Sequence, residues 1–140
     1  FESALTAAGI AFDREHQLEY GAFNRRSGGY KATQRLLQRC WEDLPTALCA
    51  GSATMLMGTF EAIHDLGLRI PDDISLIGID NVDTAIYTTP SLSLVSTSCE
   101  EIAMVTVARL IELVENGSVT PMDFVIHDVT LERRNSIRQL

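Results

Sequence analysis

Several features are missing from the sequence, and each absence excludes a class of protein. No apolar run approaches the roughly 18 residues that a membrane span requires. The first residues, Phe1 to Leu5, show no basic segment followed by an apolar one, as a secretory signal would. There is no low-complexity tract, and 46% hydrophobic with 21% charged residues is typical of a globular protein. We therefore expect a soluble domain without a membrane partner.

Cysteine and histidine are scarce and scattered. The odd number of cysteines and the lack of a C-x-x-C pair indicate reduced thiols in the cytoplasm rather than a disulfide framework or a zinc site. The histidines have no metal-ligand spacing to one another or to a cysteine. We expect neither a metal nor a cofactor. These residues are Cys40, Cys49, Cys99, His16, His64 and His127.

The charge balance is strongly acidic. The net charge is −8 and the pI is about 4.7, so this chain would repel the phosphate backbone that supplies most of the affinity for nucleic acids. Direct DNA binding by these 140 residues is therefore not expected.

What is present is an alternation of helix-like and strand-like segments, which predicts an α/β fold with a doubly wound, mainly parallel sheet. Ligands bind at the carboxyl ends of the strands in such sheets, here at residues 51–52 and 80–81. The run at 46–50 is uninterruptedly apolar and is expected to be a central strand. The expected strands are 17–23, 46–50, 74–79, 92–97 and 124–131, and the expected helices are 1–8, 30–41, 54–66, 81–87 and 100–115.

The segment 67–81, GLRIPDDISLIGIDN, resembles the pattern G-L-x-[VI]-P-x-D-[IV]-S-[VL]-[VI]-G-[FY]-D-[DN] of LacI/GalR transcription regulators almost position by position. Residues 89–95, TPSLSLV, resemble that family's T-P-P-L-T-T-V segment, and Met55 and Gly58 match the start of its N-D-x-M-A-x-G helix. The resemblance covers nearly the whole chain.

The resemblance implies a periplasmic-binding-protein-like (type I) fold, of which this chain is the C-terminal subdomain of the effector-binding region. Residues 1–95 would form that subdomain, 96–120 a crossover helix normally packed in the N-terminal subdomain, and 121–140 the return strand and tail. The helix-turn-helix headpiece that contacts operator DNA would precede Phe1. The small-molecule effector would be a sugar, a sugar acid or a sugar phosphate.

The resemblance also implies the site residues. Asp80 would accept hydrogen bonds from the effector, although it could instead cap the following helix. The Phe23 ring would stack on the effector or pack in the hydrophobic core. Ser52 and Ala53 stand where the family usually has Asn and Asp, and Thr97 stands where several members have Gln, so this chain offers fewer polar atoms there.

A homodimer is expected through the helix 54–66. Met57 and Glu61 project away from its apolar arc, and the family places the position of Met57 in the subunit interface. Ile86 and Tyr87 also match an interface segment of the family.

The helix 100–115 is apolar over more than half of its circumference, so it needs cover on more than one side. We expect it to dock against another copy or to be poorly ordered, unless it folds back on its own sheet and buries Met104, Val107 and Ile111.

Two other functions share this fold. A sugar-binding protein of a transport system uses the same strand-end chemistry. An enzyme would need a partner for Asp80, but no nucleophile elbow, phosphate-binding loop or acid/base pair of fixed spacing is present in the sequence. The sequence favours a regulator that is not an enzyme.

Overall fold

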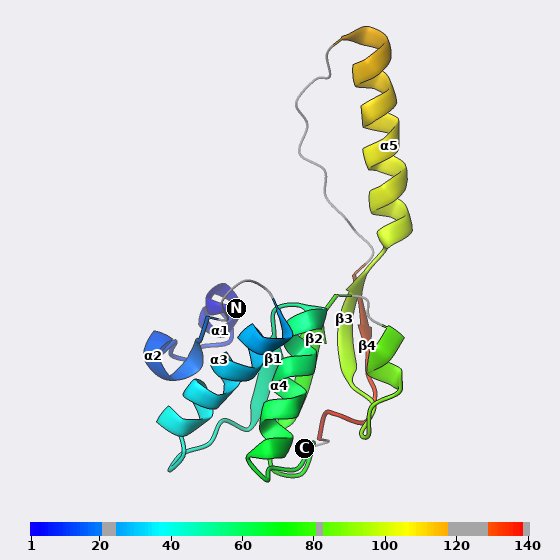
Figure 1. Ribbon diagram of the computed structural model, residues 1–140. Helices are drawn as coiled ribbons and strands as arrows, with labels where there is room; N and C mark the ends of the chain where they lie inside the picture. The colour runs from blue at the N-terminus through cyan, green and yellow to red at the C-terminus, as the bar shows by residue number, and fades with distance from the viewer. Residues whose placement is uncertain (21–24, 81–82, 118–128, 139–140) are drawn as a thin grey trace.

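The computed structural model describes residues 1–20, 25–80, 83–117 and 129–138. Its described strands form one sheet in the order β1-β2-β3-β4, in which β1, β2 and β3 are parallel and β4 is antiparallel to β3 (Figure 1). The α/β fold with a mainly parallel sheet is therefore confirmed. The strands are β1 Ala47–Ala50, β2 Ser75–Ile79, β3 Ser93–Thr97 and β4 Val129–Glu132.

Helices α3 and α4 lie against each other and cover one face of the sheet (Figure 1). Leu56 and Ile63 of α4 meet Leu76 and Leu94 of the strands in a core from which water is fully excluded. Burial of each such side chain contributes roughly 1.5–3 kcal/mol. The helices are α1 Glu2–Ala7, α2 Arg14–Gln17, α3 Arg26–Arg39, α4 Ala53–Asp65 and α5 Cys99–Asn116, with a 3₁₀-helix at Asp83–Ile86. None of the described helices is long and apolar enough to span a bilayer.

The expected strand at 17–23 is wrong where the structure describes it. Gln17 ends α2, and residues 18–20 pair with no strand of the described sheet, while residues 21–23 lie outside the described part. Two polar interactions explain why residues 17–20 do not form a strand. The Asp13 carboxylate caps α2 by accepting hydrogen bonds from two backbone N–H groups. Arg35 and Arg39 hold Glu19 at 2.9 and 3.0 Å, which ties the segment to α3.

The position of β1 also differs from the expectation. The apolar run at 46–50 was expected in the middle of the sheet, but β1 is the edge strand of the described sheet. The apolar side chains there face α3, α4 and the segment that includes Leu18 rather than two flanking strands. An uninterrupted apolar run indicates that both faces are covered, but it does not tell how many strands lie beside it.

The turn that leads from α4 into β2 is fixed by Asp73. Its carboxylate accepts hydrogen bonds from the backbone N–H, Nε and Nη2 of Arg69 at 2.8, 3.0 and 2.9 Å. The side-chain hydrogen bond from Arg69, followed by the backbone one, lowers the pKa of Asp73 to about 2. This turn sets where β2 begins.

Asp73→Asn should destabilise the domain by a few degrees in melting temperature at neutral pH. Because the pKa of Asp73 is lower in the folded chain, its contribution is present above its unfolded pKa and is lost as the pH falls toward 2. Melting curves between pH 2 and 7 would therefore converge for the wild type and the variant at acid pH. Asp72→Asn is the control, because Asp72 makes only a 3.6 Å ion pair to Arg69. An equal loss at all pH values would contradict this account.

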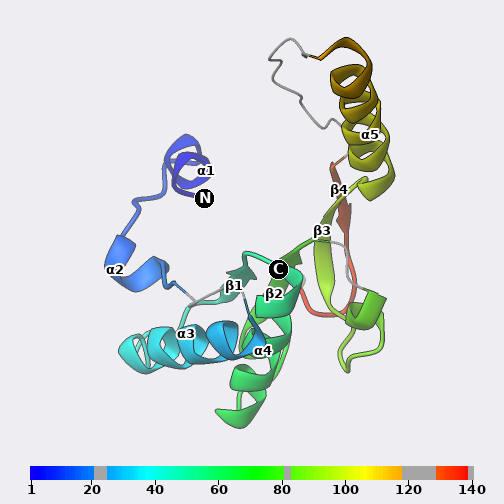
Figure 2. The same ribbon diagram turned by 45° about the horizontal axis from the view of Figure 1, so that its top comes forward.

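Helix α5 projects away from the sheet and packs on none of its own chain's described elements (Figures 1 and 2). Met104, Val107 and Ile111 are 61%, 53% and 51% exposed. The alternative in which this helix folds back on its own sheet is therefore wrong. An 18-residue helix with apolar side chains exposed on several sides needs cover from elsewhere.

Candidate functional site

The carboxyl ends of the parallel strands bring three of the four expected binding residues to one edge of the sheet. Ala50 is in register with Gly78, and Ile79 with Val95. Ser52, Asp80 and Thr97 therefore follow or end their strands at the same level. We call this region the strand-end edge. Phe23, the fourth expected residue, lies outside the described part of the chain.

Asp80 has the most distinctive backbone of the described residues. Its φ is 107°, and it is the one residue other than glycine with a positive φ in the described part of the chain. Its N–H donates to the Val95 carbonyl oxygen at 2.9 Å, so the sheet holds it in this strained conformation. The side chain is exposed. The next helix begins only at Asp83, so Asp80 does not precede it directly as a capping residue would.

Ser52 and Thr97 place hydroxyl groups at the same edge of the sheet as Asp80. Ser52 is the N-cap of α4, where its Oγ accepts a hydrogen bond from the Met55 N–H at 3.3 Å. The same Oγ lies 3.4 Å from the Thr54 Oγ1. Thr97 is half-buried at the end of β3 and is paired with Val129 of β4. The edge thus combines one carboxylate with short hydroxyl side chains.

Sequence reasoning missed the start of α5 as part of this region. The Ser98 Oγ accepts a hydrogen bond from the Glu101 N–H at 3.1 Å and so caps the helix. A carboxylate oxygen of Glu101, Oε2, is buried without a hydrogen-bond partner in the described structure. The spacing Ser-x-x-Glu before an apolar run is the signature of a capping box and would have indicated this start.

A mostly apolar cavity of about 520 Å³ adjoins the strand-end edge. It lies between the segment that includes Leu18 and Tyr20, helix α3 and strands β1 and β2, and it reaches Gly51 and Ile79. These two residues directly precede Ser52 and Asp80. The volume is in the range of small-molecule sites. This space was not expected, because residues 17–20 were predicted to be part of a strand and instead line the cavity.

A close contact between α3 and α4 positions the edge. A Cβ at Gly58 would overlap the carbonyl oxygen of Arg26, and a Cβ at Gly29 would overlap that of Met55. Only glycine allows the two backbones to approach this closely. The contact involves the first turns of both helices, so it fixes the direction in which α4 leaves Ser52.

Gly58→Ala should therefore destabilise the domain by about 1–3 kcal/mol or more, since the added methyl group forces the two backbones apart. Gly51→Ala is the matched control because a Cβ there meets nothing within 4 Å. Urea denaturation of both variants would compare their free energies of unfolding. Equal stability of the two variants would contradict the assigned role of the contact.

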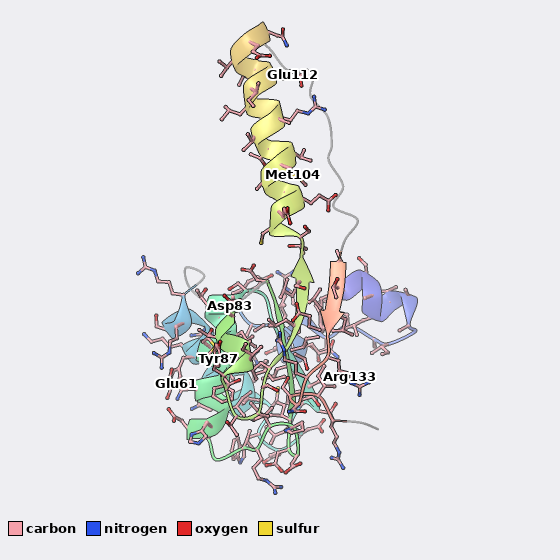
Figure 3. The ribbon with its side chains drawn as sticks, turned by 90° about the vertical axis from the view of Figure 1, so that its right-hand side faces the viewer. Glu61, Asp83, Tyr87, Met104, Glu112 and Arg133 are labelled. Atoms are coloured by element: carbon pink, nitrogen blue, oxygen red, sulfur yellow. The ribbon has the colours of Figure 1, made fainter. Side chains whose placement is uncertain are left out.

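The expected interface residues belong to α4 and to the 3₁₀-helix with the residue that follows it. Figure 3 shows Glu61, Asp83 and Tyr87 on one side of the molecule. Glu61 accepts a hydrogen bond from Arg26 at 2.8 Å, and Tyr87 is 80% exposed. Ile86 is 47% exposed. These side chains are available to a partner.

Met57 differs from the expectation. It was expected to project away from the apolar arc of its helix, but it is partly buried and packs against the core. Helix α4 is covered on more than one side, and a long flexible thioether can reach the core from outside the main arc. Met57 therefore contributes to the fold as well as to any interface.

A parallel sheet with polar groups at its carboxyl edge is the arrangement of ligand-binding domains of the periplasmic-binding-protein type. The family model for a periplasmic binding protein-like domain matches residues 1–137. The chain belongs to this family, and within it to the effector domains of LacI/GalR transcription regulators.

Individual relatives agree with this assignment. The HTH-type transcriptional repressor PurR of Erwinia tasmaniensis is 36% identical over 135 residues, which are 96% of this chain and 38% of PurR. A sugar-binding transcriptional regulator (LacI family) from Escherichia coli, complexed with phosphate, matches with a TM-score of 0.79 and 30% identity, over 97% of this chain and 47% of the other. The complex of the regulator CelR with cellobiose has a TM-score of 0.86 and 26% identity, over 96% of this chain and 40% of CelR. The chain thus spans less than half of the length of these relatives.

Proposed function

We propose that this chain is the effector-binding and dimerisation part of a cytoplasmic, LacI-type DNA-binding regulator and that it catalyses no reaction. The observation that carries the proposal is the exposed carboxylate of Asp80, held on strained backbone at the strand-end edge. A carboxylate placed this way can accept hydrogen bonds from two neighbouring hydroxyl groups of a sugar or a related small molecule. Ser52 and Thr97 add hydroxyl groups, and Phe23 would supply a stacking surface.

The comparisons favour a regulator over a sugar-binding protein of a transport system, since the named relatives are transcription regulators. Operator DNA would be contacted by a helix-turn-helix elsewhere in the longer protein, consistent with the net charge of −8 in this part. Residues 1–95 would form the effector subdomain, 96–120 the crossover into a second subdomain, and 121–140 the return. The exposed apolar sides of α5 support that division, because such a helix needs other elements around it.

Asp80→Asn in the full-length regulator should weaken effector binding about tenfold to a hundredfold, because hydrogen bonds to a charged group are worth about 1.5–3 kcal/mol. Asn has nearly the same shape and also tolerates a positive φ, so the fold and operator binding should persist. Titration calorimetry and an operator-binding assay measure the two effects separately. Asp72→Asn, at the opposite end of β2, is the control. An unchanged effector response in the Asp80 variant would remove Asp80 from the site.

The proposed homodimer can be tested at Tyr87. Tyr87→Arg should weaken self-association at least tenfold, as expected for an exposed aromatic residue placed at the centre of an interface. Trp41→Arg is the matched control, because Trp41 is another exposed aromatic residue, 51% exposed, outside the expected face. Sedimentation velocity over a concentration series measures the monomer fraction. Met57→Arg is a poorer test, because Met57 also packs against the core. A dimer that survives Tyr87→Arg would place the interface elsewhere.

A further inference from the structure

The geometry points to a flap in the N-terminal segment that opens and closes over the apolar cavity. We call residues 14–20 the flap. In the structure it is closed, and the ion pairs of Glu19 with Arg35 and Arg39 hold it against α3. Access to the cavity therefore depends on one carboxylate. This inference goes beyond the proposed function and does not depend on the identity of the effector.

The flap forms one wall of the cavity. Residues 17–20 line one side of the space, and α3 and β1 line the opposite side. Two residues of that opposite wall, Ala32 and Leu36, are buried, with exposed fractions of 5% and 8%. Movement of the flap away from α3 would expose this apolar wall to water, which is unfavourable. The closed position is thus the stable one, and opening has a measurable cost.

The segment that contains the flap is weakly packed. None of residues 1–20 is buried. Figure 2 shows α1 and α2 outside the layer formed by α3, α4 and the sheet. Segments with few buried apolar contacts open at a lower free energy than the core of the same protein. The flap is therefore able to open while α3, α4 and the sheet stay folded.

Glu19 makes the contacts that keep the flap closed. Its Oε1 accepts hydrogen bonds from Nε and Nη2 of Arg35 at 3.2 and 2.9 Å, and its Oε2 accepts one from Nη1 of Arg39 at 3.0 Å. Burial opposes the ionised form of Glu19, but the hydrogen bonds from the two guanidinium groups outweigh it and lower the pKa of Glu19. Both carboxylate oxygens are thus bound by the last turns of α3.

Cys40 lies beneath the flap and reports on its position. This residue follows the end of α3 and is buried, and its Sγ donates to the carbonyl oxygen of His16 in the flap at 3.5 Å. Opening of the flap removes this cover and makes the thiol accessible to reagents. Cys99, the first residue of α5, is exposed and belongs to a different element. The reactivity of Cys40 relative to Cys99 therefore measures how often the flap is open.

The test measures alkylation of each cysteine by iodoacetamide in the full-length protein, resolved by mass spectrometry. Glu19→Gln should raise the rate at Cys40 at least about fivefold, because it removes the charge from two ion pairs that share one carboxylate. The rate at Cys99 should stay the same. An unchanged rate at Cys40 would overturn the inference.

Two further variants test whether Glu19 acts through the arginines. Arg39→Gln should raise the rate at Cys40 by a smaller factor, and it should add less than about twofold in the Glu19→Gln background, because the two side chains share one interaction. Fully additive effects would contradict the role of the ion pairs. Glu15→Gln is the matched control, since Glu15 is an exposed carboxylate of the same segment and its backbone N–H makes the hydrogen bond to Asp13. An equal increase in this control would also count against Glu19.

Urea separates opening of the flap from unfolding of the whole domain. Opening of a short segment exposes little surface, so the rate at Cys40 should change little with urea below the unfolding transition. Global unfolding exposes much more surface and gives a steep dependence. A Cys40 rate that follows global unfolding in both the wild type and Glu19→Gln would show that the flap does not open separately, and the inference would be wrong.

Discussion

The rest of the site depends on the contact between α3 and α4 at Gly29 and Gly58. Each glycine faces a backbone carbonyl of the other helix so closely that no Cβ fits. Because the contact involves the first turn of α3, it positions Arg26 against α4. It also fixes the start of α4, and therefore Ser52. Ser52 at the strand-end edge is thus connected through α4 to the helical face that carries Glu61. A change at the edge would reach that face through rigid backbone contact.

Much of the fold follows from the sequence because its signals are local. The structure confirms within a residue or two the elements that three kinds of signal mark. These signals are the apolar runs at 74–79 and 92–97, the glycines that end helices and the turn with Asp73. The strand expected at 17–23 was wrong over its described residues, 17–20, for a physical reason. Its alternation of apolar and polar residues fits a strand, but Glu19 is bound by two arginines from α3, and a pairing across that distance in sequence leaves no local pattern.

The candidate site was predictable in part for the same reason. Strand ends in a parallel sheet meet at one edge, so Ser52, Asp80 and Thr97 could be grouped from their order alone. The positive φ of Asp80 could not be predicted, because nothing in the residue type requires it. The cavity near Gly51 and the partly buried position of Met57 depend on how whole elements pack, and single-residue patterns do not carry that information.

The strand-end edge and α5 are linked by their geometry. The helix begins at the edge, where Ser98 caps it, and its apolar sides rise directly from there (Figure 3). A partner that covers Met104 and Val107 would therefore also come near the start of the helix and the end of β3. Exclusion of water strengthens every electrostatic interaction at the edge. Cover for the helix and the strength of the polar interactions at the end of β3 would then depend on the same packing.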